Sequence, residues 1–362
     1  MAVLRFLLLS LLGIWATNTM ATGCYSALGS VVDKETSMGN ITISVPPDMP
    51  IGSEIYRIRA VSPTEAGNVG VICSVSQNMY WYFDYGDILY PESAVSSPYG
   101  GRMFETNIPG ISVVYMASGT VSAGAYTKGF PYQHAPGVYS DMFLKNNPVA
   151  KEFALIKTGD IQPGIITGAN LPTAVFSGGQ TGDMHEILRY RLTGQIMVTV
   201  PTCQIESPNK VVQMGSHLIS GTFTGIGSTS AWENASIRLI NCPTFYGNRG
   251  TTTSLTYFGI APVRANIWSL SLQPVFGTID DAKGIISLDS SGPADASGIG
   301  IQLATAQNES SFIHLNEEFS GDFPTDGVAS LAIPIFARYI QTETHVTPGR
   351  ADSSVIYQLE YR

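Results

Sequence analysis

The stretch that follows Cys73, SVSQNMYWYFDYGDILY, holds the densest supply of aromatic, amide and carboxylate side chains in the chain. An aromatic surface can cover the C–H face of a sugar ring, while carboxylates and amides can pair with its hydroxyl groups. If residues 80–85 form a strand, alternation divides their side chains between two faces: one carries Trp81, Phe83 and Tyr85, the other Tyr80, Tyr82 and Asp84. The first face is typical of a core. The second is either a ligand-binding face or a solvated face of the sheet.

The elements that must position this segment are strands. Only 13% of the 362 residues are charged, and runs such as NITISV, ISVVYM, FALIKT and IGIQLAT are separated by Gly, Pro and Asn. Such a pattern favours many short strands joined by tight turns. A chain of this length should divide into two domains that each bury a core. We therefore expect an all-β protein built from two β-sandwich domains.

The first residues predict export. Arg5 is followed by an apolar run from Phe6 to Trp15 and then by small residues ending at Ala21, which is typical of a secretory signal peptide over residues 1–21. The apolar run is too short to span a bilayer, so we expect the mature chain to be soluble. The segment QIMVTVPTCQIES predicts a boundary at Pro201, which divides the remainder into domains 22–200 and 201–362.

The four cysteines fall as one pair in each predicted domain. In an oxidising compartment the simplest of the three possible connectivities is two local disulfides, formed by Cys24, Cys73, Cys203 and Cys242. A metal site is the competing interpretation, but the spacing lacks any CxxC or Cys/His pattern. We therefore expect no metal.

Composition and motifs argue against two classes of function. The formal charge is −9 and no Lys/Arg cluster occurs, so nucleic acid is not an expected partner. The sequence has no HExxH, GxSxG or P-loop motif. Asp183, His185 and Glu186 are close in sequence and could form an acid/base group, but the pattern favours a solvated turn before a strand at Ile187. We predict neither an enzyme nor a cofactor.

The chain ends on an alternating strand, SSVIYQLEYR. Val355, Tyr357, Leu359 and Tyr361 share one face of it. A terminal strand with an apolar face needs a partner, because chain ends are otherwise polar and frayed.

The second half resembles the pilin domain of chaperone-usher fimbrial subunits. The resemblance covers residues 203–362 and rests on IRLINC around Cys242, SGIGIQL, IPIFARYIQT, VTPG and the terminal strand with Tyr361 next to last. It implies an incomplete Ig-like sandwich that is completed by a strand donated first by a periplasmic chaperone and then, after passage through an outer-membrane usher, by the adjacent subunit. The terminal strand would be the chaperone and assembly strand.

A whole domain precedes this pilin-like half, as in the two-domain tip adhesins of the type 1 kind, whose N-terminal domain is a lectin. ETNIPGISVVY and FALIKTGDIQPGIITGANLP resemble strands of those lectin domains. The resemblance implies sugar ligands in the loop after the second cysteine, and a second wall after LIKTG. It also implies that the mature amino terminus, two residues before Cys24, lies at the site. The resemblance implies Thr22, Gln77, Asn78, Asp84, Tyr85, Asp160 and Gln162 as ligand-binding residues, and the polar face of the predicted strand adds Tyr80 and Tyr82.

The resemblance therefore implies an adhesin at the tip of a fimbria on the bacterial surface, reached through the periplasm, that binds a host glycan or glycoprotein. Mannose specificity does not carry over, because Thr22 stands where the type 1 adhesin has an aromatic residue. The alternative is an adhesin that binds a host protein. A lectin predicts a small polar pocket near residues 77–85, whereas a protein binder predicts an exposed apolar patch of more than about a few hundred square ångströms.

Overall fold

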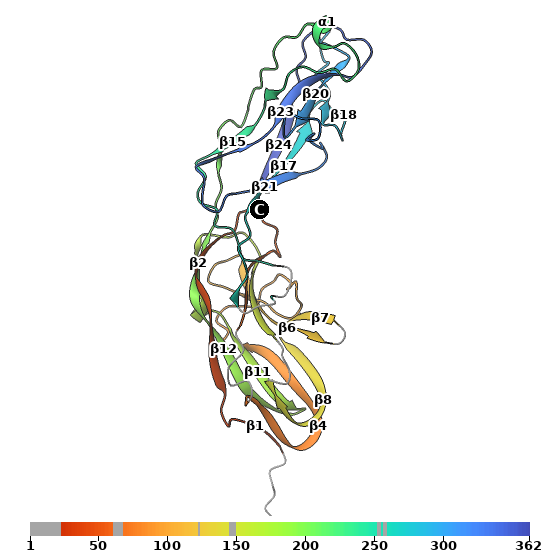
Figure 1. Ribbon diagram of the computed structural model, residues 1–362. Coiled ribbons are helices and arrows are strands. Elements are labelled where there is room, and N and C mark those ends of the chain that lie inside the picture. The colour runs from red at the N-terminus through yellow and green to blue at the C-terminus, as the bar shows by residue number, and fades with distance from the viewer. Residues whose placement is uncertain (1–22, 61–67, 122–123, 145–149, 252–254, 256–258) are drawn as a thin grey trace, which may run out of the picture.

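The computed structural model describes residues 23–60, 68–121, 124–144, 150–251, 255 and 259–362, and shows two elongated parts joined end to end (Figure 1). The all-β prediction is confirmed: over these ranges helix is confined to short turns, chiefly α1 (Ile219–Thr222) and the 3-10 turn η3 (Gly168–Asn170). No helix in the described part of the chain is long and apolar enough to cross a membrane. The predicted signal peptide and Thr22 lie outside the described residues.

The N-terminal part consists of two sheets. The first contains β1 (Cys24–Ser26), β2 (Val32–Ser44), β4 (Gly70–Gly86), β8 (Tyr132–Phe143), β10 (Gly164–Thr167), β11 (Thr173–Gln180) and β12 (Asp183–Thr199). The second contains β3 (Glu54–Arg59), β5 (Phe104–Glu105), β6 (Ile111–Val121), β7 (Gly124–Gly129), β9 (Ala150–Lys157) and β16 (Gly259–Ile260). All pairings are antiparallel except that of β2 with β12.

The core of this part lies between the two sheets. Phe83 on β4 meets Phe176 on β11 edge to face at 5.0 Å, and Tyr85 stacks across the sheets on Tyr115 of β6 at 5.2 Å. Trp81, Phe83 and Tyr85 are buried, as alternation predicted. Offset and edge-to-face aromatic contacts add to the free energy gained by burying the rings.

The C-terminal part contains three smaller sheets around a second core. They comprise β13 (Gln204–Ile205), β15 (Ile237–Ile240) and β22 (Ser330–Ile333); β14 (Glu233–Asn234), β18 (Thr278–Asp280), β19 (Ile285–Ile286), β20 (Ile299–Ala304) and β23 (Phe336–Gln341); and β17 (Ile267–Pro274), β21 (Phe319–Asp322) and β24 (Val355–Tyr361). The first core takes residues from Cys24 to Val198 and the second from Phe223 to Tyr361.

Both predicted local disulfides are present. Cys24 lies directly opposite Cys73 in the β1–β4 pair, with 3.9 Å between their Cα atoms. Cys203 and Cys242 are joined with 4.3 Å between Cα atoms. Cys73 lies within β4 and Cys242 lies two residues after β15, so each bond joins residues of the same part and no disulfide crosses between the two cores.

One segment of the second half does not stay with its own core. Residues 246–251, 255 and 259–264 lie at the N-terminal part, where β16 forms the outer strand of the second sheet (teal in Figure 1). The domain boundary near Pro201 therefore stays a prediction. In the structure, the outer strand of the second sheet of the N-terminal part comes from the second half of the chain.

Candidate functional site

β4 carries most of the predicted ligand residues and lies, with β8, at the end of the molecule remote from the C-terminal part (Figure 1). Gln77 and Asn78 are exposed there. They face β8 directly, because Gln77 pairs with Tyr139 and Asn78 with Val138. The structure therefore brings these two amides to an accessible position at the distal end.

Tyr85 is a correction to the predicted ligand set. Its ring is only 8% exposed, and its hydroxyl group donates to Arg102 O (2.7 Å) and accepts from Tyr115 N (3.0 Å). Burial raises the pKa of this phenol well above its usual range. The hydroxyl group joins strands of the two sheets and is not available to a ligand.

The outer face of β4 carries Tyr80, Tyr82 and Asp84, as alternation predicted. Asp84 Oδ1 lies 3.0 Å from Arg102 Nη2, and both side chains are partly exposed. Partial burial, followed by the neighbouring Asp84 carboxylate, raises the pKa of Tyr82. Because Asp84 already has a cationic partner, this face has the character of a solvated sheet surface.

Asp160 and Gln162 are exposed but do not meet the β4 residues, which corrects the expectation of a second wall. Asp160 follows β9 and contacts Gly110, and it lies near Lys157, whose Nζ donates to Pro47 O (2.5 Å). Pro47 is next to Asp48, which accepts a hydrogen bond from the C-terminal strand. The loop therefore lies at the joint between the two parts, at the opposite end of the first part from Gln77.

A groove of about 500 Å³ lies between β4 and β8, near the predicted site. It is lined by Trp81, His134, Ala135, Pro136, Tyr139, Asp141, Met142 and Phe143. We call it the β4–β8 groove. The pairing of the two strands is irregular between Ile72 and Gln77 and between Met79 and Trp81. Such irregularities bend a strand and redirect its side chains.

Trp81 gives the β4–β8 groove a buried donor. The residue is 1% exposed, and its Nε1 has no hydrogen-bond partner among the described residues. His134 lies directly opposite it on β8. The polar and aromatic composition of YQHAPGVYSD was a signal for this groove, but Asp141 could not be placed without the strand register.

A second polar cluster anchors the first strand. Asp183 Oδ2 accepts from Cys24 N (2.5 Å), and its Oδ1 lies 2.9 Å from His185 Nε2. The Cys24 amide and then His185 lower the pKa of the Asp183 carboxyl group. Asp183 begins β12 after a two-residue turn. Its carboxylate accepts the hydrogen bond that holds the start of β1 in place, and it does not form an acid/base pair in a cleft.

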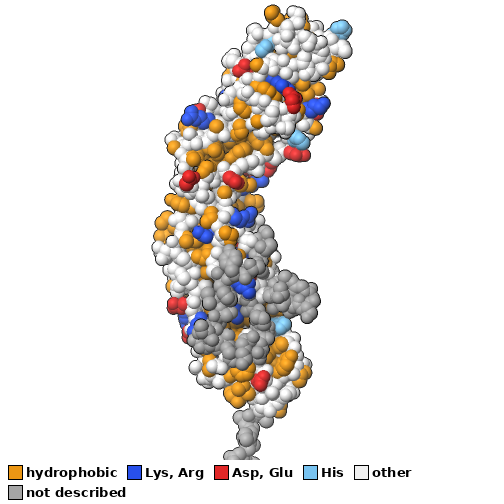
Figure 2. Space-filling model, in the orientation of Figure 1, with side chains coloured by type: hydrophobic (Ala, Val, Ile, Leu, Met, Phe, Trp, Pro, Cys, Tyr) orange, Lys and Arg blue, Asp and Glu red, His pale blue; other side chains and the backbone are white. Residues whose placement is uncertain are grey.

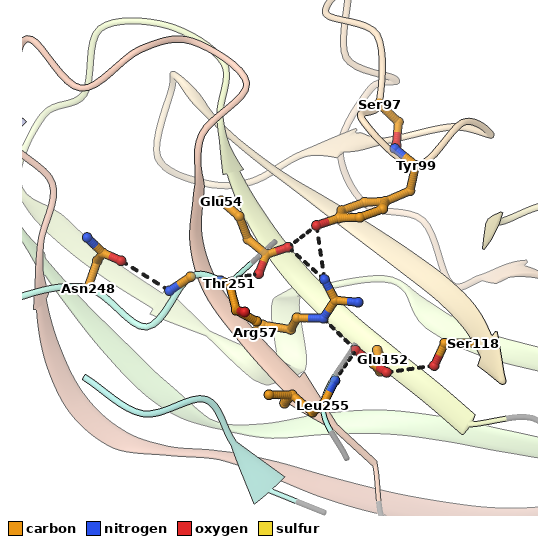
Figure 3. Close-up of polar contacts among 10 residues, drawn as sticks. Glu54, Arg57, Ser97, Tyr99, Ser118, Glu152, Asn248, Thr251 and Leu255 are labelled. Atoms are coloured by element: carbon orange, nitrogen blue, oxygen red, sulfur yellow. Dashed lines mark hydrogen bonds and ion pairs between the residues drawn. The ribbon is translucent and has the colours of Figure 1, made fainter. Parts of the chain in front are cut away.

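The joint contains a buried ion network (Figure 3). Arg57 is fully buried, and its guanidinium group donates to Glu152 (2.5 Å) and Glu54 (3.2 Å). The C-terminal half supplies two further donors: Thr251 N to Glu54 Oε1 (2.8 Å) and Leu255 N to Glu152 Oε2 (3.4 Å). Burial raises the pKa of Glu54, and the nearby Arg57 guanidinium only partly opposes this effect. Burial by itself would lower the pKa of Arg57, but the carboxylates of Glu54 and Glu152 outweigh it, so the pKa of Arg57 is raised. The network holds Thr251 and Leu255 beside β3.

Backbone contacts complete this attachment. Arg57 N donates to Arg249 O (3.0 Å), and Ala261 N donates to Arg57 O (2.9 Å). The buried Asn266 side chain accepts from Gly247 N (3.1 Å) and donates to Ser44 O (3.1 Å). β3 thus has a strand on both sides, β9 and β16.

β24 has a different environment. It pairs with β17 and with no other described strand. Val355, Tyr357 and Leu359 pack against the second core but stay half-buried, while Ile356 on the other face is 60% exposed. In the view of Figure 2, hydrophobic side chains form a band across the C-terminal part, in the region where Figure 1 places β15 and β24.

The comparisons with known proteins agree with the pilin-like resemblance of the second half. Residues 190–362 match the family described as Fimbrial protein, which confirms the prediction of a fimbrial domain there. No curated protein matches the chain in sequence.

Three solved structures of adhesins or their complexes are similar to the chain over most of its length. The CupB6 tip adhesin of Pseudomonas aeruginosa is 14% identical, with 87% of this chain and 89% of that chain covered and a TM-score of 0.36. A chain of the CsuC–CsuE chaperone–tip adhesion subunit complex of Acinetobacter baumannii is 12% identical, with 93% and 100% covered and a TM-score of 0.24. The Escherichia coli adhesin CfaE is 8% identical, with 92% and 97% covered and a TM-score of 0.19.

Proposed function

Because residues 190–362 match the fimbrial protein family, we propose that the chain is a tip adhesin of a chaperone-usher fimbria. Its N-terminal part binds a glycan on the host cell surface. Its C-terminal part attaches it to the fimbria. The protein is exported through the periplasm, and it is not an enzyme.

The proposed attachment to the fimbria rests on the open edge of β24, which among the described strands pairs with β17 on one side only. Arg362 and Ile267 exchange both of their backbone hydrogen bonds, and Val275 N donates to Ser354 O. In an antiparallel pair the hydrogen-bonded residues alternate, so with this register the N–H and C=O groups of Val355, Tyr357 and Leu359 point away from β17. An unpaired row of this kind binds an added strand.

The partners of that edge are strands from other chains. A periplasmic chaperone would pair with β24 before export through the usher, and the adjacent subunit would replace the chaperone in the fimbria. The half-buried side chains of β24 would then become fully covered. Tyr357, whose hydroxyl group donates to Pro208 O (3.1 Å), connects β24 with the chain that follows β13.

The receptor-binding part of the proposal rests on the distal end of β4. Gln77 and Asn78 supply accessible amides next to the β4–β8 groove, and the groove adds aromatic and acidic side chains. A modest affinity at one site would be increased by many fimbriae binding at once.

A protein receptor is the second candidate, because apolar side chains are also exposed at this end. Val138 is 60% exposed and Tyr139 48% exposed on β8. A surface of this kind could contact a host protein without a sugar.

The experiment that separates the two candidates is glycan-array binding by the full mature chain, displayed on fimbriae or purified with its chaperone. The segment 22–200 alone is unsuitable, because it lacks β16. We expect binding to at least one glycan. Retained attachment to host cells without binding to any glycan would refute the lectin and favour the protein receptor.

A further inference from the structure

We propose that the β4–β8 groove is the sugar site and that it selects a neutral sugar over a sialylated or otherwise acidic one. This inference rests on the proposed glycan-binding function and names both the location and the ligand class. Neither follows from the ligand set that the sequence predicted, of which Trp81, His134 and Asp141 are not members.

The groove has the dimensions and composition of a sugar site. Its volume of about 500 Å³ falls within the usual range for small-molecule sites, about 300–1,000 Å³. Tyr139 supplies an exposed aromatic ring, and Pro136 and Phe143 add apolar surface. These groups can cover the C–H face of a pyranose ring, whereas His134 and Asp141 can pair with its hydroxyl groups.

Trp81, which lines the groove, carries an indole N–H group without an acceptor among the described residues. A buried N–H group without an acceptor is uncommon in folded proteins, because losing its hydrogen bond to water costs free energy. Trp81 Nε1 is such a group among the described residues, and the residue lines the groove. Because Nε1 is itself buried, a sugar hydroxyl oxygen would reach this donor only when neighbouring side chains move on binding.

The charges lining the groove decide the ligand class. Among the lining residues that the structure describes, Asp141 is the only acidic one, and none is Lys or Arg. A sialic acid or uronic acid carboxylate would meet Asp141 with no guanidinium or ammonium group to pair with it. Repulsion and an unpaired charge both oppose binding of such a sugar. A neutral hexose or N-acetylhexosamine presents only hydroxyl and amide groups, which fit these side chains.

The test uses the full mature chain with its chaperone and an array that contains matched neutral and sialylated glycans. We expect binding to neutral members only. Asp141→Asn should weaken that binding by about tenfold or more, the loss associated with one charge-assisted hydrogen bond. The matched control is Asp33→Asn, the same change at an exposed carboxylate on β2 outside the groove, which should leave binding unchanged.

Trp81 supplies a direct readout. It is the only tryptophan between residue 23 and Trp232, so a change in tryptophan fluorescence on adding the bound neutral glycan, absent in Trp81→Phe, would report contact in the groove. Trp81→Phe also removes ring atoms that pack against Gly178, so it can destabilise the core. Asp141→Asn does not have this drawback, because Asp141 is exposed.

The outcomes separate the two levels of the proposal. Binding of sialylated glycans in preference to neutral ones, or glycan binding unaffected by Asp141→Asn, would overturn the groove assignment and leave the lectin function standing. Attachment to cells with no glycan bound would overturn the lectin function itself.

Discussion

Two strands of this molecule, β3 and β24, differ in whether the chain itself covers their outer edge. β3 is covered by β16 from the same chain, with buried charges and backbone hydrogen bonds on both sides. β24 keeps one edge without a strand in the described structure, and its apolar face stays half-buried. The difference shows which interactions the chain completes alone and which it leaves for another chain. A permanent joint and an assembly site are both made by adding a strand, so the source of that strand distinguishes them.

Removing the internal strand should have the largest effect. We expect segment 23–200, which lacks β16, to be less stable than the same part in the full chain by roughly 5 kcal/mol, because it loses several backbone hydrogen bonds and the burial of Leu255. Hydrogen exchange at the Arg57 amide would report the opened edge. A peptide of residues 245–266 added in trans should restore protection, and equal protection in both forms would contradict the covered-edge interpretation.

Breaking the ion network should be nearly as costly. Arg57→Met leaves the carboxylates of Glu54 and Glu152 buried without their cation, a loss of about 3–5 kcal/mol in urea unfolding. The control is the double variant Arg57→Met/Glu152→Gln. It removes one of the two buried carboxylates that have lost their cation, so it should recover part of the lost free energy of unfolding. A double variant less stable than the single one would show that Arg57 acts by packing alone.

Matched leucine truncations should separate the two edges. Leu255 at the covered edge is 6% exposed, so Leu255→Ala should cost about 2–4 kcal/mol in the isolated chain. Leu359 at the open edge is half-buried, so Leu359→Ala should cost about 1 kcal/mol or less in isolation but clearly reduce incorporation into fimbriae. Incorporation at the normal level would remove β24 from the assembly interface.

A smaller effect is expected at the closest backbone approach. A Cβ at Gly250 would lie 1.8 Å from Glu54 O, so Gly250→Ala must push residues 246–264 away from β3, at a cost of about 1–3 kcal/mol. Gly221→Ala is the control, because a Cβ there has no atom within 4 Å. Thermal unfolding of both variants measures the difference. Equal melting temperatures would mean that the close approach is readily relieved.

Local patterns predicted much of the fold. The alternation in residues 80–85 placed Trp81 and Phe83 in the core, and the distribution of cysteines indicated two local disulfides. The apolar period of residues 355–361 likewise predicted a strand that packs on the second core. The strand faces depend on neighbours one or two residues away, which sequence periodicity reports directly, whereas the disulfides were indicated by one pair of cysteines falling in each predicted domain.

The candidate site was predicted less completely. Tyr85 shared the periodicity of the core and was still counted among the ligands, but its hydroxyl group bonds across the sheets. Asp160 was expected beside the sugar and lies at the joint instead. β16 had no sequence signal, because two residues in a Gly- and Thr-rich segment are too short for a period to show.

By itself, then, the sequence determined the strand-rich class, the local cysteine pairs and the apolar face of the last strand, because each is encoded in spacing along the chain. The tertiary structure alone decided that β16 covers the edge of β3, that Arg57 and Glu152 are buried together, and that Trp81 lies opposite His134. Each of these joins residues more than fifty positions apart, and such contacts depend on strand register and chain path, which no local period encodes.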